Sequence, residues 1–150
     1  MKILFVCTGN TCRSPMAEAA AAKIIEKYEF DSAGIFAVDG DSISENAKNV
    51  LLENGYNIES FTSKRVSLEL LNKSDLILTM TREQKEVLKT FFLEEKDKIF
   101  TLKEYNRSEK NLQEISDPFG GDLGTYRKVF SEIEEEIKKL GDNNVRKKYF

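Results

Sequence analysis

The sequence predicts an α/β fold in which a four-stranded parallel sheet is covered by helices on both faces. Short apolar runs alternate with helix-forming segments along the chain, and this alternation is typical of strand–helix–strand units with parallel strands. The 150 residues suit one hydrophobic core. No repeat, linker or low-complexity stretch interrupts the alternation, so residues 1–150 are expected to form a single domain.

Four apolar runs are the expected strands of this sheet. Residues 3–6 are continuously apolar, as expected of a strand that is buried on both faces. Residues 30–33 form a second run, which Gly34 ends. Two further runs, residues 76–78 and 99–102, complete the set.

Helices are expected in the segments between these runs. Residues 16–28 consist largely of strong helix formers, and Pro15 suits the first turn before them. Ser44 is placed to cap a helix that Gly55 ends. A short helix is expected over residues 67–73.

The second half of the chain predicts two longer helices. The helix over residues 81–92 is expected to turn three side chains inward, those of Val87, Leu88 and Phe91. The last helix is expected over residues 123–140, ended by Gly141. Its inward positions, at spacings of three and four, are Tyr126, Phe130, Ile133, Ile137 and Leu140. A polar loop at residues 106–121 is the one long connection, and long loops in compact domains are often functional.

The composition is that of an ordinary soluble protein. Apolar residues make up 40% of the chain and charged residues 33%, and the net charge of -3 gives no reason to expect a nucleic-acid partner. The basic stretch at residues 146–148 is short and is expected to be a solvated tail. No stretch approaches the roughly 20 apolar residues of a membrane span, and the apolar start lacks a signal-peptide cleavage pattern. A cytoplasmic location without membrane binding is therefore expected.

Two features of the composition restrict the chemistry. The chain has no histidine, which excludes cysteine–histidine and serine–histidine–aspartate catalysis as well as histidine-ligated metal sites. Its two cysteines, Cys7 and Cys12, are too few for a four-thiolate zinc site, and no metal or other cofactor is expected. A nucleophile must therefore be activated without imidazole, and the proton donor is expected to be a carboxylate.

The turn after the first expected strand has the features of an anion site. Residues 7–13 read CTGNTCR and join that strand to the first expected helix. Ligands of α/β sheets bind beyond the carboxyl ends of strands, where backbone N–H groups and a helix N-terminus can hold a phosphate. Gly9 is expected to allow a tight loop without a Cβ clash, and Asn10 tolerates left-handed backbone geometry. Arg13 can hold two phosphate oxygens in a bidentate fork.

The same positive potential favours the thiolate form of Cys7, because cysteine thiols ionise more readily at a helix N-terminus or beside arginine. Ser14 can donate a hydrogen bond to that thiolate. A thiolate next to a bound phosphoryl group is a nucleophile placed for in-line attack. A Cys-x5-Arg pattern alone is weak, but the strand before it, the glycine inside it and the Ser-Pro after it favour the functional interpretation.

Three motifs of the chain together resemble the low-molecular-weight protein tyrosine phosphatases. Residues 7–15 match the loop motif C-x-G-N-x-C-R-S-P, residues 32–34 match the second-strand motif S-A-G, and residues 117–118 match the late D-P motif. Length and element order are also similar, so the resemblance covers essentially the whole chain. It implies a three-layer α/β/α fold with a four-stranded parallel sheet, of the low-molecular-weight phosphatase type.

The resemblance also implies a role for each matching residue. Cys7 is implied to be the nucleophile, Arg13 the phosphate clamp and Asp117 the general acid. Asn10 and Ser14 are implied to support the loop and the thiolate. Phosphate is expected to bind along the loop, at the positions of Thr8, Gly9, Asn10, Thr11 and Cys12.

Within that family, the loop is similar to the bacterial protein-arginine phosphatase branch. Residues 7–18 read CTGNTCRSPMAE, with Thr11 where tyrosine-specific members usually carry an aliphatic residue, and residues 117–121 read DPFGG. The resemblance implies that phosphoarginine in proteins is the substrate. The hydroxyl and branched Cβ of Thr11 suit a polar, planar guanidinium, and Phe36 and Phe119 are expected to lie beside its stem. For Phe36, packing in the core is the alternative.

Other functions stay open on the sequence. A phosphotyrosine phosphatase is the main alternative. A thioredoxin-coupled arsenate reductase shares this loop but relays electrons through later cysteines, and no cysteine follows Cys12. A non-catalytic phosphate-binding module would need neither Cys7 nor Asp117. Cys12 itself is either a packing residue or a redox partner that protects oxidised Cys7 as a disulfide. The chain is expected to act as a monomer on phosphorylated proteins.

Overall fold

The computed structural model describes residues 1–58, 60–108 and 114–142. Within these ranges the strands are β1 (Lys2–Cys7), β2 (Glu29–Gly34), β3 (Leu76–Thr79) and β4 (Ile99–Thr101). The helices are α1 (Arg13–Ile24), α2 (Glu45–Glu53), α3 (Leu68–Lys73), α4 (Arg82–Phe91), the 3-10 helix η1 (Leu93–Lys98), α5 (Leu102–Tyr105) and α6 (Leu123–Asp142). The strands pair in parallel in the order β2-β1-β3-β4, which confirms the predicted four-stranded sheet.

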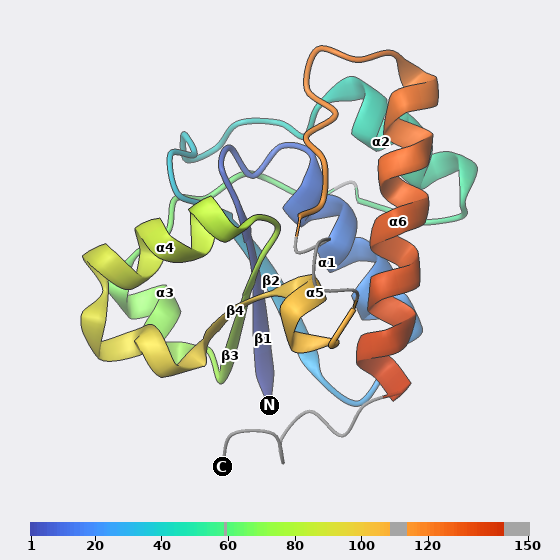
Figure 1. The fold of residues 1–150 in the computed structure, drawn as a ribbon. Coiled ribbons are helices and arrows are strands. Elements are labelled where there is room, and N and C mark those ends of the chain that lie inside the picture. The colour runs from blue at the N-terminus through green and yellow to red at the C-terminus, as the bar shows by residue number, and fades with distance from the viewer. Residues whose placement is uncertain (59, 109–113, 143–150) are drawn as a thin grey trace.

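Helices cover both faces of this sheet. α1, α2, α5 and α6 lie on one side, and α3 and α4 lie on the other (Figure 1). In the central strand β1, Ile3 and Phe5 belong to the first of these two cores, whereas Leu4 and Val6 belong to the second. All four side chains are fully buried. This division explains why the strand is continuously apolar rather than alternating.

The sheet order places the turn after β1 at a switch point. β2 lies on one side of β1 and β3 on the other, so the chain leaves β1 toward one edge of the sheet and leaves β3 toward the other. A crevice forms beyond the carboxyl ends of the strands where the order reverses in this way, and ligands of open α/β sheets bind there. The turn at residues 8–12 therefore lies at the expected ligand site of the fold.

The helix with a predicted serine cap, α2, starts where it was expected. The Ser44 side chain accepts a hydrogen bond from Ala47 N at 3.3 Å at the start of α2. After this helix, Gly55 adopts a left-handed backbone with φ of 81°. α1 ends at Ile24, four residues earlier than predicted, because the backbone of Ile25 is extended and leads into β2.

The fourth strand is shorter than predicted, because Leu102 begins α5 rather than extending β4. A capping box explains the difference. The Thr101 side chain accepts from Glu104 N at 3.0 Å, and the Glu104 carboxylate accepts from Thr101 N at 3.1 Å. Such reciprocal bonds fix a helix start.

Two predictions about the longer helices are wrong. Phe91 is 73% exposed, because the buried stripe of α4 runs through Gln84 and Leu88 instead. α6 continues through Gly141, which was expected to end it. A Cβ at Gly141 would come within 3.1 Å of Ile25 Cγ1. The lack of a side chain at this position therefore lets α6 pack closely against Ile25. The five predicted inward positions of α6 are confirmed as buried.

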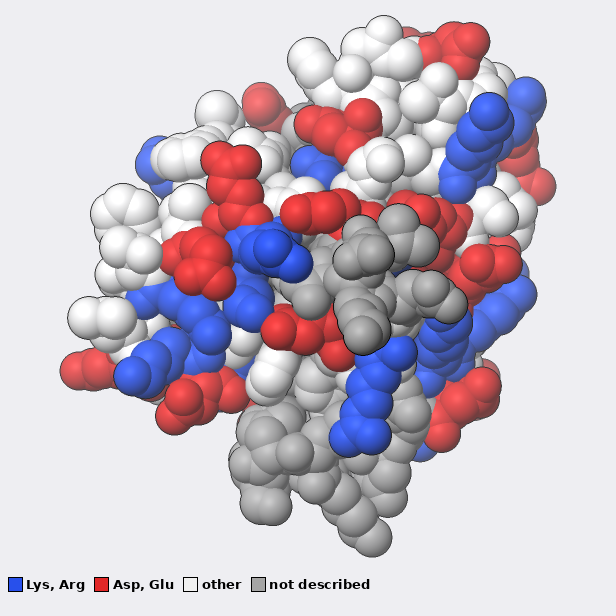
Figure 2. Space-filling view, viewed as in Figure 1, with Lys and Arg blue, Asp and Glu red and all other residues white. Residues whose placement is uncertain are grey.

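Charged side chains of both signs are intermixed on the face of the molecule shown in Figure 2. The predicted basic tail at residues 146–148 and the central part of the predicted polar loop, residues 109–113, lie outside the described residues. Among the helices of the described ranges, none has the length and apolar character needed to cross a bilayer.

Candidate active site

Hydrogen bonds to carbonyl oxygens hold the loop between β1 and α1. The donors lie in the neighbouring segments: Ile35 N, Phe36 N, Ser63 Oγ, Ser44 N and Met16 N. In the same order, they bind the carbonyl oxygens of Cys7, Thr8, Asn10, Thr11 and Cys12 at 2.6–3.2 Å. Every one of these loop carbonyls therefore points outward, toward the surrounding protein.

The backbone N–H groups of the loop face the other way. In a planar trans peptide the N–H points opposite to the C=O, so the N–H groups that follow these carbonyls point to the concave side. The Asn10 N–H, which follows the Gly9 carbonyl, also points to this side, since it donates to the Cys7 sulfur at 3.3 Å. Convergent N–H groups at a helix N-terminus form an anion-binding cradle, which is the arrangement expected from the sequence.

Two backbone features shape the loop. Asn10 adopts the expected left-handed conformation, with φ of 56°. Gly9 does not play the expected part, since a Cβ there would meet only Thr11 Oγ1 at an ordinary 3.6 Å. The residue that must be glycine is Gly34, at the end of β2. A Cβ on Gly34 would lie 2.7 Å from Thr8 O and 2.8 Å from Asn10 N, so its absence lets β2 approach the loop.

Cys7 lies buried at the bottom of the loop. Its sulfur is 2.9 Å from the Ser14 hydroxyl and accepts the bond from Asn10 N. Above it is a cavity of about 270 Å³, lined by Cys7, Thr8, Gly9, Thr11, Cys12, Arg13, Asp117 and Phe119. The structure thus brings most of the predicted site residues around one small hollow.

The Asn10 side chain is the brace of the loop. Its Oδ1 accepts from Lys64 N at 2.9 Å, which identifies the other end of the amide as the donor. Nδ2 then donates to Ser14 Oγ at 2.8 Å and to Ser32 Oγ at 3.0 Å. The Asn10 side chain is completely buried. Because Ser14 accepts from this amide, its own hydrogen has two acceptors within reach, the sulfur of Cys7 at 2.9 Å and the carbonyl oxygen of Ala33 at 3.4 Å. The shorter contact is the one to the sulfur.

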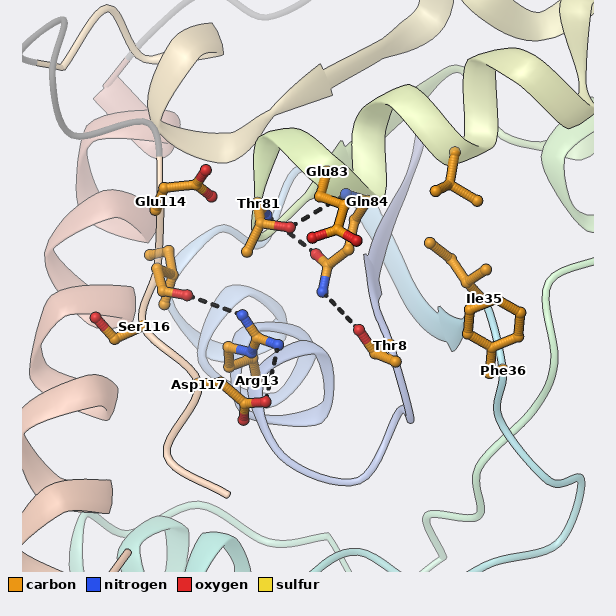
Figure 3. A pocket seen from close by; sticks show the side chains of 12 residues that line it. Thr8, Arg13, Ile35, Phe36, Thr81, Glu83, Gln84, Glu114, Ser116 and Asp117 are labelled. Carbon is orange, nitrogen blue, oxygen red and sulfur yellow. Dashed lines mark hydrogen bonds and ion pairs between the residues drawn. The ribbon is translucent and has the colours of Figure 1, made fainter. Parts of the chain in front are cut away.

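Arg13 projects from the first turn of α1 and is only 5% exposed. Its Nη1 donates to the carbonyl oxygen of Ile115 at 2.9 Å, and its Nη2 lies 3.6 Å from the Asp117 carboxylate (Figure 3). Ile115 N in turn donates to Met80 O at the end of β3. The guanidinium is therefore fixed between the loop and the segment that carries Asp117.

Asp117 lies at the mouth of the cavity, and its side chain is 55% exposed. Its Oδ1 accepts from Phe119 N at 3.0 Å, and Gly121 N donates to Pro118 O at 2.8 Å. This turn keeps the Asp117 side chain facing the loop. The carboxylate stays accessible to water. A carboxyl in that place can exchange protons with a group bound above Cys7.

A second hollow, of about 430 Å³, adjoins the first (Figure 3). Gln84 projects into it from α4 and donates to Thr8 Oγ1 at 3.1 Å. The same side chain closes a capping box with Thr81. Gln84 therefore ties the end of β3 to the loop. The Thr81-x-x-Gln84 spacing is a capping signal that the sequence analysis did not use.

Phe36 lines the second hollow rather than the first and is 63% exposed. Core packing, the alternative considered for this residue, is therefore wrong. Phe119 lines the first hollow and is 79% exposed. Of these two aromatic rings, only Phe119 borders the cavity above Cys7.

Cys12 lies at the start of α1 and is buried beside two hydroxyl groups. Its sulfur donates to Ser44 Oγ at 3.4 Å and lies 3.4 Å from the Tyr126 hydroxyl. Burial, followed by the contact with Cys12, raises the pKa of Tyr126. Both cysteines are free thiols. Among the described residues, no group of three histidine, cysteine or acidic side chains is placed to hold a metal ion.

Several residues that support the loop were not predicted to do so. Ser63, Gln84 and Ser44 hold the loop, and Glu18 binds the Ser32 hydroxyl behind it. Their contacts join segments that are distant in the sequence, so no local pattern indicates them.

Comparison with known proteins agrees with this geometry. The family model "Low molecular weight phosphotyrosine protein phosphatase" matches residues 2–149. A low-molecular-weight protein-tyrosine-phosphatase, PtpB of Staphylococcus haemolyticus, is 42% identical over 96% of this chain and 100% of its own length. A protein-arginine-phosphatase of Bacillus subtilis is 38% identical over 93% of this chain and 94% of its own length.

A solved structure is similarly close. It is described as the YwlE arginine phosphatase in a C7S mutant form with a phosphorylated active site serine, and it superimposes with a TM-score of 0.91 at 36% identity. The match covers 99% of this chain and 98% of that chain. The parallel sheet, the loop at its switch point and these relatives lead to one assignment: the chain belongs to the low-molecular-weight protein tyrosine phosphatase family of protein phosphatases.

Proposed function

We propose that this phosphatase hydrolyses phosphoarginine in proteins through a phosphocysteine at Cys7. The observation that carries the proposal is the place of Thr11. This half-buried residue lines the same cavity as Cys7, next to the nucleophile. A relative named protein-arginine-phosphatase and a YwlE structure with a phosphorylated active site serine support the proposal.

In the first step, the Cys7 thiolate attacks the phosphorus of the bound phosphoryl group. The sulfur–phosphorus bond forms as the phosphorus–nitrogen bond breaks. The carboxyl of Asp117 donates its proton to the departing guanidino nitrogen, so that arginine leaves with a protonated guanidinium group. The N–H groups of the loop and the Arg13 guanidinium bind the three remaining oxygens, where charge is concentrated in the transition state.

In the second step, water attacks the phosphocysteine. The Asp117 carboxylate accepts a proton from that water as the new phosphorus–oxygen bond forms. The sulfur–phosphorus bond breaks, inorganic phosphate leaves and the Cys7 thiolate is restored. Ser14 and the Asn10 N–H stabilise this leaving thiolate, since both reach the sulfur in the structure.

Thr11 is proposed to select the substrate. Its hydroxyl offers a hydrogen-bonding group at the cavity wall, and its branched Cβ narrows the space next to Gly9. A polar guanidinium can use the hydroxyl, whereas a phenol ring leaves it without a partner when water is excluded. Unpaired polar groups are the usual source of strong discrimination in a site.

Replacement of Thr11 tests the proposal. The wild type, Thr11→Ile, Thr11→Val and Thr11→Ser are compared by kcat/KM on a phosphoarginine peptide and a phosphotyrosine peptide of the same flanking sequence. We expect the ratio of the two values to shift toward phosphotyrosine by roughly tenfold or more in Thr11→Ile, as the loss of a polar contact of about 1–2 kcal/mol predicts. Thr11→Ser keeps the hydroxyl and Thr11→Val keeps the shape, so they separate the two contributions.

The main alternative is a phosphotyrosine phosphatase, which the name of the Staphylococcus haemolyticus relative favours. A wild type that prefers phosphotyrosine, with a ratio unchanged in Thr11→Ile, would establish that alternative. Cys7→Ser separates both enzymes from a phosphate-binding module. It must abolish hydrolysis of an aryl phosphate if Cys7 is the nucleophile.

A further inference from the structure

A continuous row of hydrogen bonds runs from the Cys7 sulfur through the loop to a carboxylate behind it. The sulfur lies 2.9 Å from Ser14 Oγ. The Asn10 amide donates to Ser14 at 2.8 Å and to Ser32 at 3.0 Å. The Ser32 hydroxyl donates to Glu18 Oε1 in a very short bond. Every link in this row joins side chains that are buried or half-buried.

The donor and acceptor properties of these groups fix the direction of the bonds that join Asn10 to the two serines and Ser32 to Glu18. Asn10 Nδ2 has two hydrogens and uses both, one toward each serine. Ser32 can accept from Asn10 only with its oxygen, so its single hydrogen must go elsewhere. Glu18 supplies the acceptor. Without it, the hydrogen of a fully buried hydroxyl would lose its partner.

We propose that Glu18 is a positioning residue that holds the two hydrogen-bond donors of the Cys7 sulfur in place. The carboxylate orients the Ser32 hydroxyl, whose oxygen then anchors the Asn10 amide. The backbone N–H of Asn10 is the first donor to the Cys7 sulfur. The second is the Ser14 hydroxyl, whose oxygen accepts from the Asn10 amide and is thereby held beside the sulfur. The inference rests on the proposed role of Cys7 as nucleophile.

Glu18 also has charged neighbours that do not belong to this row of hydrogen bonds. Asp31 of β2 and Lys64 lie with it around a hollow of about 320 Å³ on the outer side of α1. The ammonium of Lys64 pairs with Asp31 at 2.6 Å, and Lys2 lies 3.9 Å from the same carboxylate. Burial raises the pKa of Glu18, while the bond from Ser32 acts in the opposite direction. A carboxyl in either protonation state still has an oxygen that accepts the Ser32 hydroxyl.

The experiment measures the rate of Cys7 alkylation by iodoacetamide against pH, with the modified peptide identified by mass spectrometry so that Cys12 is not counted. The variants are Glu18→Ala, Glu18→Gln, Ser32→Ala and the double variant Glu18→Ala/Ser32→Ala. Glu26→Ala is the matched control, because it removes an exposed carboxylate just after α1. The melting temperature of each variant is measured alongside.

We expect the midpoint of alkylation to rise by about 0.5–1 pH unit in Glu18→Ala, with kcat for an aryl phosphate lowered about threefold to tenfold, as partial loss of a bond to a charged sulfur predicts. Glu18→Gln, whose amide oxygen also accepts from Ser32, should keep the wild-type midpoint. Ser32→Ala should match Glu18→Ala, and the double variant should add nothing further, because both changes act through the same bond.

Two results would overturn the inference. A Glu18→Ala midpoint equal to that of wild type, with only the melting temperature lowered, would make Glu18 a stability residue alone. Midpoints that fall in both Glu18→Ala and Glu18→Gln would show that its charge acts on the thiolate directly. Alkylation needs no turnover, so these outcomes are distinct from a failure of the proposed function, which is hydrolysis that persists in Cys7→Ser.

Discussion

Gly34 offers a way to move the loop between β1 and α1 without changing any residue in it. It is the last residue of β2, and its backbone lies against the loop. An added Cβ would lie 2.7 Å from Thr8 O, 2.8 Å from Asn10 N and 2.9 Å from Ala37 Cβ. Two of these three atoms are loop backbone, so a rotamer change cannot relieve the contacts. Gly34→Ala must push the loop away from the strand.

The size of the effect follows from these distances. To reach an ordinary contact of 3.4 Å, the Thr8 carbonyl must retreat by about 0.7 Å. A misplacement of about 1 Å in a catalytic group can cost about 10²-fold in rate. We therefore expect kcat/KM for an aryl phosphate to fall by roughly 10- to 100-fold. Overpacking of this kind costs about 1–3 kcal/mol, which lowers the melting temperature of a chain this long by roughly 2–12 °C.

The assay compares Gly34→Ala with Gly124→Ala. Gly124 lies in the first turn of α6, where a Cβ would meet only Asp122 Oδ1 at 3.4 Å. The control should keep the activity and the melting temperature of the wild type. Sulfate affinity, followed by its protection of Cys7 from alkylation, reports on the loop independently of turnover. If Gly34→Ala hydrolyses the substrate within twofold of wild type, the close approach of β2 does not shape the site.

Three further changes have defined outcomes. Arg13→Lys loses both the bidentate fork and the bond to the Ile115 carbonyl, so kcat for an aryl phosphate should fall by about 10²–10³-fold; a loss below tenfold would contradict the clamp role. Cys12→Ser should make peroxide inactivation harder to reverse with thiol, because oxidised Cys7 then has no neighbouring thiol for a disulfide; equal recovery in both proteins counts against that role. Glu18→Gln tests the linkage of stability to pH. Burial raises the folded-state pKa of the Glu18 carboxyl above 4.5, so the wild type should lose unfolding free energy relative to the variant as pH rises from about 4 to about 7; chemical denaturation measures this difference, and a gap that stays constant with pH would be the contrary result.

The parts of the fold and site that follow from local sequence were the ones that could be predicted. The continuous apolar run of β1 reports burial on both faces, and the glycine after α2 reports the end of that helix. Asn10 was expected to adopt a left-handed backbone because its residue type tolerates one, and it does. Each of these features depends on a residue and its near neighbours in the chain.

Features that depend on close approach between distant segments could not be predicted. The need for glycine was assigned to Gly9, inside the loop, whereas the crowded position is Gly34, which reaches the loop only through the pairing of β2 with β1. Similarly, Phe36 was grouped with Phe119, but the folded chain places it beside a different hollow. No periodicity or motif in the sequence indicates how closely two distant segments approach each other in the fold.

The amide of Asn10 stands at the centre of this site. A side chain that braces the loop must donate in two directions and accept in a third, and Asn10 does so with a group that does not titrate. The hydrogen bonds of the Asn10 amide therefore keep the same direction over the whole neutral range. The titratable carboxyl groups of the site lie one step further out, Glu18 behind the loop and Asp117 in front of it. In the proposed mechanism the proton moves at Asp117, which lies against Arg13 and outside the hydrogen-bonded row around Asn10, so the Asn10 brace takes no part in proton transfer.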